Sequence, residues 1–431
     1  MKRVLIASAW QNSSREYDIA VWKKKQNPFS VNASMTEHFG LRFLKANVPE
    51  VSILEYPTKE QFLDELKKGW DVVGVSFYIN ETQDAIEMAK AARNSGAEVW
   101  AGNYGALNQE MEPHFDRLFT GWGEQAMAEL IGREPAPLIH PPVYMHIRYR
   151  RLHLQKWGVL FTSRGCNKTC HFCQTPRFYR KPYAIELSAL EKVLWEYRRQ
   201  GVGQVIVLDE NFGHFEKEAR EVVDLIHKYR LKWNPLTRVE AVHRNYDDWV
   251  ARGLCGASMG VESLNQDSLN GAKKGNSTDQ IREVLRNMQR DHLLSQVFYI
   301  IGFEEDTEES IRRDILELKR YNVDSPQIQI LTPYPQTILH RRIQEEFGIL
   351  DQDLSKYDST HLVWGHPSIS PEKMRELLFW ANDELFTRKS SLSTLNKMVR
   401  QNLMRVVRRP WQGVSRTPLW AGGIDPHASS R

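Results

Sequence analysis

The sequence predicts an α/β protein with two successive parallel sheets followed by a helical C-terminal region. Two observations predict the sheets: short apolar runs alternate with amphipathic helical patterns over residues 1–135, and the same alternation resumes from residue 157. Strands that alternate with helices form parallel sheets, because each helix returns the chain to the same edge. A third observation separates the two units, since the segment EPAPLIHPPV around residues 134–143 carries prolines that interrupt both helices and central strands.

The first unit is predicted to be an open, doubly wound sheet over residues 1–135. Ligands of such sheets bind at the carboxyl ends of the strands. The candidate binding residues therefore lie in three segments, 76–82, 102–105 and 121–124, and include Ser76, Gly102 and Asn103. The expected strands cover residues 3–9, 51–56, 71–78, 98–103 and 117–121, and two of the expected helices cover 36–48 and 82–96.

The second unit is predicted to be a partial barrel over residues 157–345, after a linker over 136–156. Six strand–helix units are too few for a closed eightfold barrel, so the barrel should be open, with its functional mouth at the carboxyl ends. Residues 346–431 are expected to be helical with a basic tail. The expected barrel strands cover residues 158–163, 204–209, 238–242, 257–262, 295–302 and 326–331, and the expected helices cover 186–200, 216–230, 277–291 and 308–321.

Composition excludes several classes of protein. The 431 residues carry 58 basic and 54 acidic side chains, a formal charge of +4, which does not indicate a nucleic-acid-binding protein. The apolar run 297–303 is far shorter than the roughly 20 residues that span a bilayer. There are four cysteines, and they are not scattered in pairs as in a secreted disulfide scaffold. We therefore expect a cytoplasmic protein.

Three of the cysteines, Cys166, Cys170 and Cys173, lie in one short loop directly after the first expected barrel strand. Their Cys-x3-Cys-x2-Cys spacing lets one loop wrap three thiolates around a cuboidal iron–sulfur cluster, with one iron left open. A structural zinc site is the main alternative, but it needs four ligands, and the nearby His171 is adjacent to Cys170. Three inert buried cysteines are the second alternative. We expect the remaining cysteine, Cys255, to be a small buried core residue.

With Phe172 before the last cysteine, this segment resembles the signature of the radical S-adenosylmethionine superfamily, and the resemblance extends over residues 157–345. It implies a partial barrel of six strands and six helices. It also implies that Cys166, Cys170 and Cys173 bind a 4Fe-4S cluster whose open iron is chelated by S-adenosylmethionine. Reductive cleavage of that ligand would leave methionine and a 5′-deoxyadenosyl radical, which abstracts a substrate hydrogen.

The resemblance also assigns cofactor contacts to the strand ends. An acidic contact to the methionine amino group is expected after the second strand, contacts to ribose or carboxylate after the fourth, and the adenine after the fifth. Three of these motifs have a structural alternative: Asp209 and Glu210 would cap the following helix, Glu262 would be an ion-pair partner, and Gly302 would be only a turn. The residues so assigned are Phe172, Asp209, Glu210, Glu262, Ser263, Gly302 and Tyr334. No residue is identified as catalytic toward the substrate.

The N-terminal unit resembles the cobalamin-binding domain that precedes the barrel in one branch of the superfamily. The Asp-x-His-x-x-Gly pattern that supplies a histidine to cobalt is absent after the first strand, where the sequence reads AWQNSSREYD. Gly102 and Asn103 stand where the double glycine of that domain would lie. Bound cobalamin and a sheet kept only as a scaffold therefore both remain open.

Two enzymatic readings follow from the resemblance. With cobalamin, the expected reaction is methyl transfer to an unactivated carbon of a small or lipid-like organic substrate. Without it, the radical would drive a rearrangement, a cyclisation or a bond formation. An electron donor such as flavodoxin or ferredoxin is implied in both. A non-enzymatic metal-binding adaptor is the remote third reading.

The segment from Leu392 predicts a basic amphipathic helix. Its apolar positions include Leu395, Met398 and Val399, and its basic positions are Lys397, Arg400, Arg405, Arg408 and Arg409, with Trp411 beyond them. Such a helix can lie in the headgroup layer of an anionic membrane, which would make the enzyme peripheral at the membrane. The alternative is a helix that packs its apolar face on the barrel.

Overall fold

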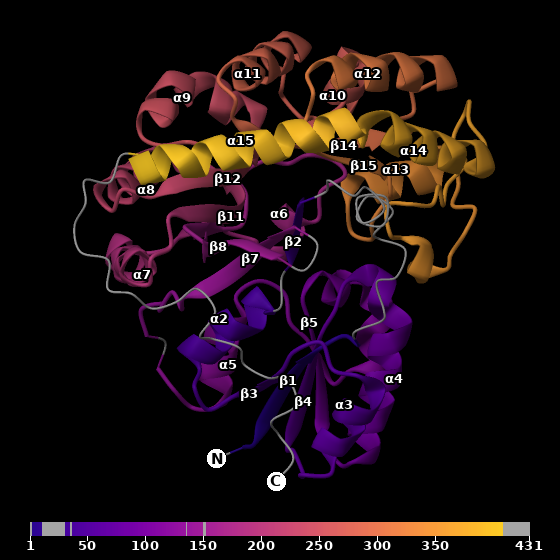
Figure 1. The fold of residues 1–431 in the computed structure, drawn as a ribbon. Helices are drawn as coiled ribbons and strands as arrows, with labels where there is room; N and C mark the ends of the chain where they lie inside the picture. Colours follow the sequence, from indigo (N-terminus) through magenta and orange to yellow (C-terminus); the bar gives the residue numbers. More distant parts are fainter. Residues whose placement is uncertain (1, 11–30, 35–36, 135, 150–151, 408–431) are drawn as a thin grey trace.

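The computed structural model describes residues 2–10, 31–34, 37–134, 136–149 and 152–407. Figure 1 shows two sheet-containing units, the N-terminal one in indigo and violet and the barrel from magenta to orange. The strands of the N-terminal unit run toward the barrel, so the carboxyl edge of the first sheet faces the second unit.

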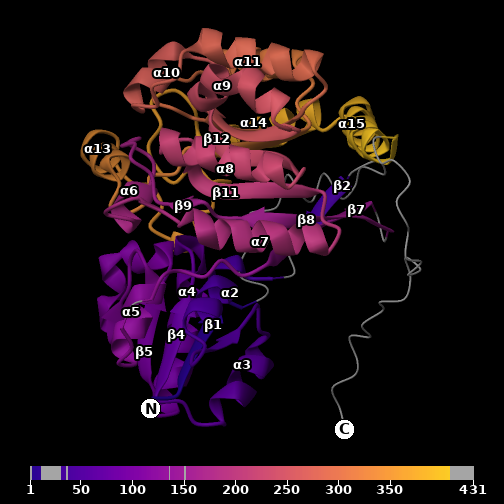
Figure 2. The same ribbon diagram turned by 90° about the vertical axis from the view of Figure 1, so that its left-hand side faces the viewer.

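The N-terminal unit is a doubly wound sheet of five parallel strands, as the sequence predicts. Its core lies in two layers: α3 and α4 cover one face of the sheet, and α2 and α5 cover the other (Figure 2). The strands, in spatial order, are β3 (Ser52–Leu54), β1 (Val4–Ser8), β4 (Val72–Ser76), β5 (Glu98–Gly102) and β6 (Arg117–Leu118). The helices are α2 (Phe39–Asn47), α3 (Lys59–Leu66), α4 (Thr82–Asn94) and α5 (Gly123–Leu130).

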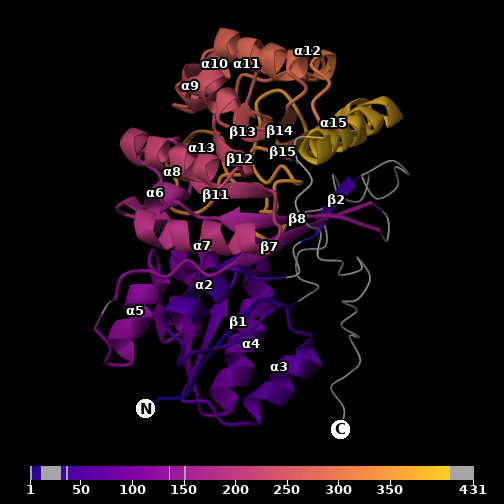
Figure 3. The same ribbon diagram turned by 60° about the vertical axis from the view of Figure 1, so that its left-hand side comes forward.

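The second unit is a curled sheet that does not close, with six parallel strands and an antiparallel extension at one edge. Its helices line the outside of the curl (Figure 3). The parallel strands are β8 (Leu152–Leu160), β11 (Gln204–Phe212), β12 (Lys232–Arg238), β13 (Gly256–Glu262), β14 (Leu294–Ile301) and β15 (Ser325–Ile330), and the extension consists of β7 (Val143–Tyr149) and β2 (Val31–Ser34). The helices between them include α7 (Leu187–Arg199), α8 (Glu216–Lys228), α9 (Val239–Ala251), α10 (Gln266–Gly271), α11 (Thr278–Arg290) and α12 (Glu308–Arg320), and α13 (Ile338–Glu346) follows the last strand.

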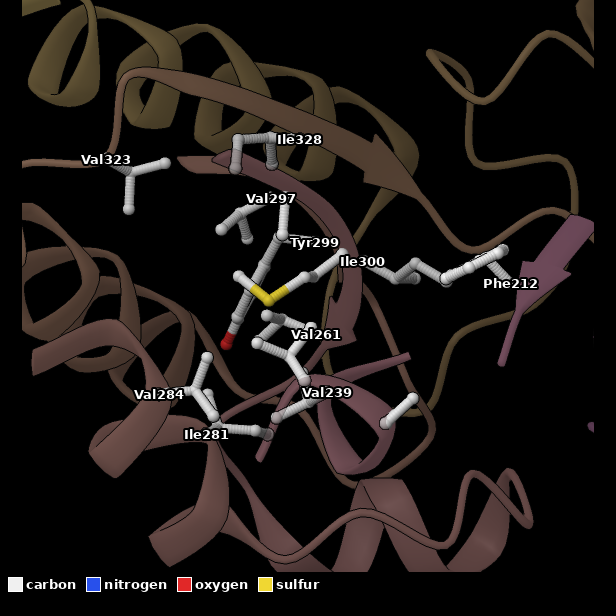
Figure 4. Packing of buried hydrophobic residues seen from close by; sticks show 14 of the residues in the cluster. Phe212, Val239, Val261, Ile281, Val284, Val297, Tyr299, Ile300, Val323 and Ile328 are labelled. Carbon is white, nitrogen blue, oxygen red and sulfur yellow. The ribbon is translucent and has the colours of Figure 1, made fainter. Parts of the chain in front are cut away.

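The barrel core forms where strand side chains meet the apolar stripes of the surrounding helices. Figure 4 shows Val261 of β13 and Val297 of β14 packed near Ile281 and Val284 of α11. These side chains are at most 1% exposed, so each contributes roughly the 1.5–3 kcal/mol of a fully buried aliphatic side chain. This packing fixes the strands whose ends carry the candidate site.

The third barrel strand was predicted in the wrong place. Residues 239–242 of the expected strand begin α9, and the strand is the segment up to Arg238, β12, which contains Pro235. Proline lacks the N–H that a central strand donates, so the sequence pattern argued against a strand there. As a result Arg238 ends a strand instead of beginning one.

The predicted linker over residues 136–156 is also only partly correct. Residues 143–149 form β7, which pairs antiparallel with β8, and the buried side chains of Val143, Met145 and Ile147 alternate along it. The period of two was overlooked because the prolines just before it dominate the segment.

The described part of the C-terminal region has two α-helices, α14 (Pro371–Leu385), as predicted, and α15 (Arg388–Val407), but residues 347–370, also expected to be helical, contain only the short 3-10 helix Leu354–Lys356. α15 packs across the amino ends of the barrel strands: Lys397 Nζ bonds to Asp324 Oδ2 at 2.7 Å, and Gln401 Nε2 donates to the carbonyl of Cys255 at 2.8 Å. Lys397 was placed on the basic face turned toward a membrane, and this is wrong, since it is 5% exposed. Its charge is buried because it has a carboxylate partner.

The apolar residues of the predicted membrane-facing helix surface are not all exposed. Met398 is buried against the barrel, whereas Val399 is 46% exposed, so the apolar positions do not form one free stripe. Arg408, Arg409 and Trp411 lie outside the described residues. Among the helices of the described residues, none is long and apolar enough to cross a membrane.

Candidate iron–sulfur and S-adenosylmethionine site

The cysteine loop leaves β8, passes through the short strand β9 (Ser163–Arg164) and ends at α6 (Thr175–Phe178). Gly165 turns the chain with φ of 83°, and a Cβ atom there would lie 2.9 Å from the Cβ of Tyr179. Glycine is therefore required at the start of the loop. The loop lies at the carboxyl mouth of the barrel, where Cys166 and Cys173 are half-buried and Cys170 is buried.

The cysteine sulfurs accept hydrogen bonds from the surrounding protein. Cys166 Sγ accepts from the backbone N–H of Lys168 at 3.4 Å and from Asn211 Nδ2 at 3.5 Å. Cys170 Sγ accepts from Arg238 Nη1 at 3.3 Å. Burial raises the pKa of the Cys166 and Cys173 thiols, so the thiolate form needs such donors or a metal. Three thiols in one loop, two of them facing N–H donors, fit the ligand set of an iron–sulfur cluster.

The same loop offers no arrangement for a single metal ion. In the described part of the chain, no three side chains of His, Cys, Asp or Glu are grouped as ligands of one ion. A cuboidal cluster needs no such convergence, because each thiolate binds a different iron.

The two acidic residues at the end of β11 have different roles. The Asp209 carboxylate is buried and accepts hydrogen bonds from the backbone N–H of Thr162, at 2.7 Å, and from Ser163 Oγ, at 2.7 Å. These bonds tie β11 to the cysteine loop, so Asp209 acts as a structural acceptor here. Glu210 Oε2 accepts the N–H of Gly165 at 2.9 Å, and burial raises the pKa of Glu210 to about 7.

Glu262 and Ser263 lie at the end of β13, as predicted. Glu262 has φ of 66° and pairs with Lys274 through a 2.6 Å contact, both side chains being nearly fully buried. Ser263 is 1% exposed, and its Oγ accepts the N–H of Asn265 at 3.0 Å. Glu262 thus forms the ion pair that the structural alternative expects. Its positive φ is a second feature, because strained backbone is typical of functional sites.

The remaining barrel candidates lie around the same mouth. Gly302 follows β14 with φ of 86°, and its N–H donates to Asp306 Oδ2 at 2.8 Å. Tyr334 has its hydroxyl 2.8 Å from Ser359 Oγ. Phe172 is half-buried against the barrel core. Cys255 lies elsewhere: it is 2% exposed in the core, as predicted, and burial raises the pKa of its thiol to about 12.

The carboxyl edge of the N-terminal sheet meets the cysteine loop. Ser76 ends β4 and Gly102 ends β5, and Asn103 follows with φ of 67° and ψ of −173°. The next residue, Tyr104, reaches across: its hydroxyl lies 3.1 Å from Thr175 Oγ1, and its ring centroid lies 4.7 Å from that of Phe178. The two predicted sites therefore share one interface.

A second bridge joins the same two regions. Arg164, two residues before Cys166, lies 3.5 Å from Glu124 in the first turn of α5. Its guanidinium also lies over the ring of Phe43, 4.3 Å from the centroid, in a cation–π contact. The entry to the cysteine loop is thus anchored on the N-terminal unit.

Sequence reasoning missed two residues that the fold brings to this site, Arg238 and Lys274, and it placed Tyr104 and Asn211 at strand ends without assigning a contact to either. Asn211 lies in the motif that includes Asp209 and Glu210, so its strand-end position was available. Arg238 was hidden by the misplaced third strand. Nothing in the sequence marks Lys274 as the partner of Glu262, because the pairing depends on how the chain folds back after α10.

Comparisons with known proteins identify relatives of the barrel and of the whole chain. Residues 160–318 match the model of the radical SAM superfamily. The chain is 25% identical over 337 residues to bacteriochlorophyllide d C-12(1)-methyltransferase of Chlorobaculum tepidum, which covers 72% of this chain and 73% of the relative. It is 23% identical over 298 residues to anaerobic magnesium-protoporphyrin IX monomethyl ester cyclase of Synechocystis sp., which covers 60% of each chain.

The fold is also similar to a solved structure, that of the radical S-adenosylmethionine methyltransferase TsrM from Kitasatospora setae. The form with tryptophan substrate and an S-adenosylmethionine analog bound has a TM-score of 0.63 at 14% identity, covering 95% of this chain and 99% of TsrM. The form with cobalamin and a 4Fe-4S cluster bound has a TM-score of 0.60 at 15% identity, covering 80% and 78%. The likeness extends over both units of the fold.

Proposed function

Since the chain belongs to the radical S-adenosylmethionine superfamily and is an enzyme, we propose that it transfers a methyl group from S-adenosylmethionine to an organic substrate with the aid of cobalamin. In this proposal Cys166, Cys170 and Cys173 are the ligands of a 4Fe-4S cluster. The observation that carries the proposal is the contact of Tyr104 with Thr175, which brings the carboxyl edge of the N-terminal sheet against the cysteine loop. A group bound on that edge would lie beside the cluster.

The residues of the barrel mouth suit the binding of S-adenosylmethionine. Glu262 and Ser263 offer a carboxylate and a hydroxyl for the ribose diol, and the turn at Gly302 lets a planar base approach the backbone closely. Glu210, with its pKa near 7, can accept a hydrogen bond from the ligand amino group when ionised. These four residues therefore bind and orient the ligand in this proposal.

The backbone at the carboxyl edge of the N-terminal sheet is compatible with a bound corrinoid. Asn103 adopts a conformation that is ordinarily reserved for glycine, so the turn keeps the course of a Gly-Gly turn although a side chain is present. The sequence offers no histidine after the first strand, so the cobalt would have no histidine ligand from that turn. When bound, the corrinoid would supply the methyl group.

The second candidate function is a radical cyclisation or rearrangement without cobalamin. It is favoured by one observation: the ring of Tyr104, directly after the Gly102-Asn103 turn, packs against Phe178 with the ring centroids 4.7 Å apart. The similarity to the cyclase is compatible with it. In this case the N-terminal sheet would serve as a wall of the substrate site.

We further propose that the substrate is a large, apolar organic molecule, since the names of the relatives above refer to bacteriochlorophyllide and magnesium-protoporphyrin. The electron would come from a small redox protein such as flavodoxin or ferredoxin. Peripheral membrane contact through the chain beyond Gln401 remains a prediction. Its measurement is co-sedimentation with anionic vesicles, compared between the full chain and a version that ends at Gln401.

Product analysis separates the two functions. Anaerobically reconstituted protein should hold about four irons per chain and, after reduction with dithionite, should convert S-adenosylmethionine to 5′-deoxyadenosine. Methyl transfer additionally leaves S-adenosylhomocysteine, because the donor loses its methyl group. A protein that forms only 5′-deoxyadenosine with its substrate would support the second function. One that cleaves no S-adenosylmethionine would exclude both.

The corrinoid is tested on the same preparation. Protein purified from cells supplied with cobalamin should show a corrin absorption band, and Asn103→Trp should remove it by placing an indole in the turn. The matched control is Asn94→Trp, since Asn94 is exposed at the C-terminal end of α4, in the same unit but outside the turn. A band that survives Asn103→Trp would place the corrinoid elsewhere.

A further inference from the structure

Arg238 is a buried cation beside the cysteine loop. It ends β12, its residue is 6% exposed, and its Nη1 donates to Cys170 Sγ at 3.3 Å. An arginine is always protonated, so its charge is present at every working pH. A fixed positive charge therefore touches one of the three proposed cluster ligands.

The guanidinium is held in place by two other groups. Nη2 donates to Asn276 Oδ1 at 3.4 Å, and Asn276 in turn donates from Nδ2 to the carbonyl of Gly260 at 3.3 Å. Nε donates to Glu240 Oε1 in the first turn of α9. Glu240 Oε2 is buried and has no hydrogen-bond partner among the described residues. The arginine thus lies between a thiol on one side and a partly satisfied carboxylate on the other.

This arrangement has an electrostatic consequence for a cluster bound there. One-electron reduction adds a negative charge, which a nearby cation stabilises and a nearby anion opposes, most strongly in a buried site of low dielectric. Hydrogen bonds to cluster sulfurs act in the same direction as the cation. Arg238 contacts the ligand directly, whereas Glu240 contacts only the arginine, so the effect of Arg238 should be the larger.

We propose that Arg238 is a positioning residue that makes the cluster easier to reduce, and that Glu240 partly offsets this effect. The inference rests on the proposed function, because it requires the cluster at Cys166, Cys170 and Cys173. It goes beyond that function by assigning control of the reduction potential to two residues outside the cysteine loop.

The test is a redox titration of the reconstituted cluster, followed by electron paramagnetic resonance without S-adenosylmethionine. In Arg238→Met the ratio of reduced to oxidised cluster at a fixed potential should fall at least tenfold, which corresponds to 59 mV for a one-electron couple. Arg238→Lys keeps the charge and should shift less. Glu240→Gln should shift the ratio in the opposite direction, because a negative charge is removed.

A purely structural role would not give shifts of opposite sign. The control is Arg282→Met, which breaks a guanidinium–carboxylate pair with Glu317 between α11 and α12 and should leave the potential unchanged. If Arg238→Met fails to assemble a cluster, Glu240→Gln decides the question by its upward shift. The inference is overturned if the reduction potential is unchanged in an Arg238→Met protein that contains a cluster, or in Glu240→Gln. A wild-type protein that binds no cluster would instead overturn the proposed function.

Discussion

The barrel carries a buried lysine–carboxylate pair at each of its two ends. At the carboxyl end Lys274 contacts Glu262 at 2.6 Å, and at the amino end Lys397 contacts Asp324 at 2.7 Å. All four side chains are less than 10% exposed, so both pairs bear the cost of removing charges from water. The pairs are alike in chemistry and burial, but their surroundings differ.

The amino-end pair belongs to a well-connected network with ordinary backbone geometry. Asp324 accepts further hydrogen bonds from the N–H of Ser295 at 2.9 Å and from Thr394 Oγ1 at 2.8 Å. At the carboxyl end, Glu262 has a positive φ, and the strand register shifts beside it. Satisfied networks stabilise a fold, whereas strain concentrates at functional sites. The comparison indicates that one end of the barrel serves stability and the other serves ligands.

The largest expected effect is the loss of chemistry from the carboxyl end alone. Replacing Cys166, Cys170 and Cys173 together by alanine should abolish iron binding and all cleavage of S-adenosylmethionine, because no ligand of the cluster remains. The barrel should stay folded, since its core and its amino end are untouched. Iron analysis, product chromatography and circular dichroism measure the three quantities. Cys255→Ala serves as the control that keeps its iron, and any cleavage by the triple variant would falsify the assignment of the ligands.

The two lysines provide the next test. Lys397→Met leaves Asp324 buried without its cation and should lower the free energy of unfolding by about 3–5 kcal/mol. The folded fraction should still cleave S-adenosylmethionine at the wild-type rate. Denaturant unfolding and single-turnover cleavage give the two numbers.

Lys274→Met should behave differently, because Glu262 is expected to contact the ligand. Its loss of stability should come with weaker binding of S-adenosylmethionine, measured as a raised dissociation constant. Equal binding by both lysine variants would remove the distinction between the two ends.

Glu210 adds a pH dependence to the carboxyl end. Burial raises the pKa of this carboxyl from 4.5 to about 7, so the folded protein keeps a proton that the unfolded chain has released. Stability should therefore fall as pH rises from about 4.5 to about 7, by about 3 kcal/mol at most, and then level off. In Glu210→Gln this contribution should vanish. Unfolding of cluster-free protein across that pH range measures it, and parallel curves for both proteins would contradict the expected role of burial.

The smallest expected effect concerns the N-terminal edge. Asn103 adopts φ of 67° and ψ of −173°, which costs a residue with a side chain about 1–3 kcal/mol. Asn103→Gly should therefore raise the free energy of unfolding of the N-terminal unit by about 1 kcal/mol. Asn94→Gly, in a helix, should lower it, since glycine is a poor helix former. A destabilised Asn103→Gly variant would mean that the asparagine side chain makes a compensating contact.

Most of the fold could be predicted from the sequence. The five N-terminal strands and five of the six barrel strands follow apolar runs, and their parallel pairing follows from the helices between them. The third barrel strand could not be recognised, because Pro235 and the polar residues around it break the pattern. Likewise, the roles of the adjacent Asp209 and Glu210 could not be distinguished from the sequence. Their side chains point to opposite faces of the strand, and only the tertiary structure shows which groups each face meets.

What the sequence determined by itself is the chemistry of the loop at Cys166, Cys170 and Cys173, because the spacing of ligands within one loop is a local property of the chain. What only the tertiary structure decided is the environment of those ligands. Asn211 reaches Cys166 from 45 residues away, and Arg238 reaches Cys170 from 68 residues away. Such contacts depend on which strand ends meet at the barrel mouth, and strand order and register arise from the packing of the whole core. The charges that surround the site are therefore set by the fold.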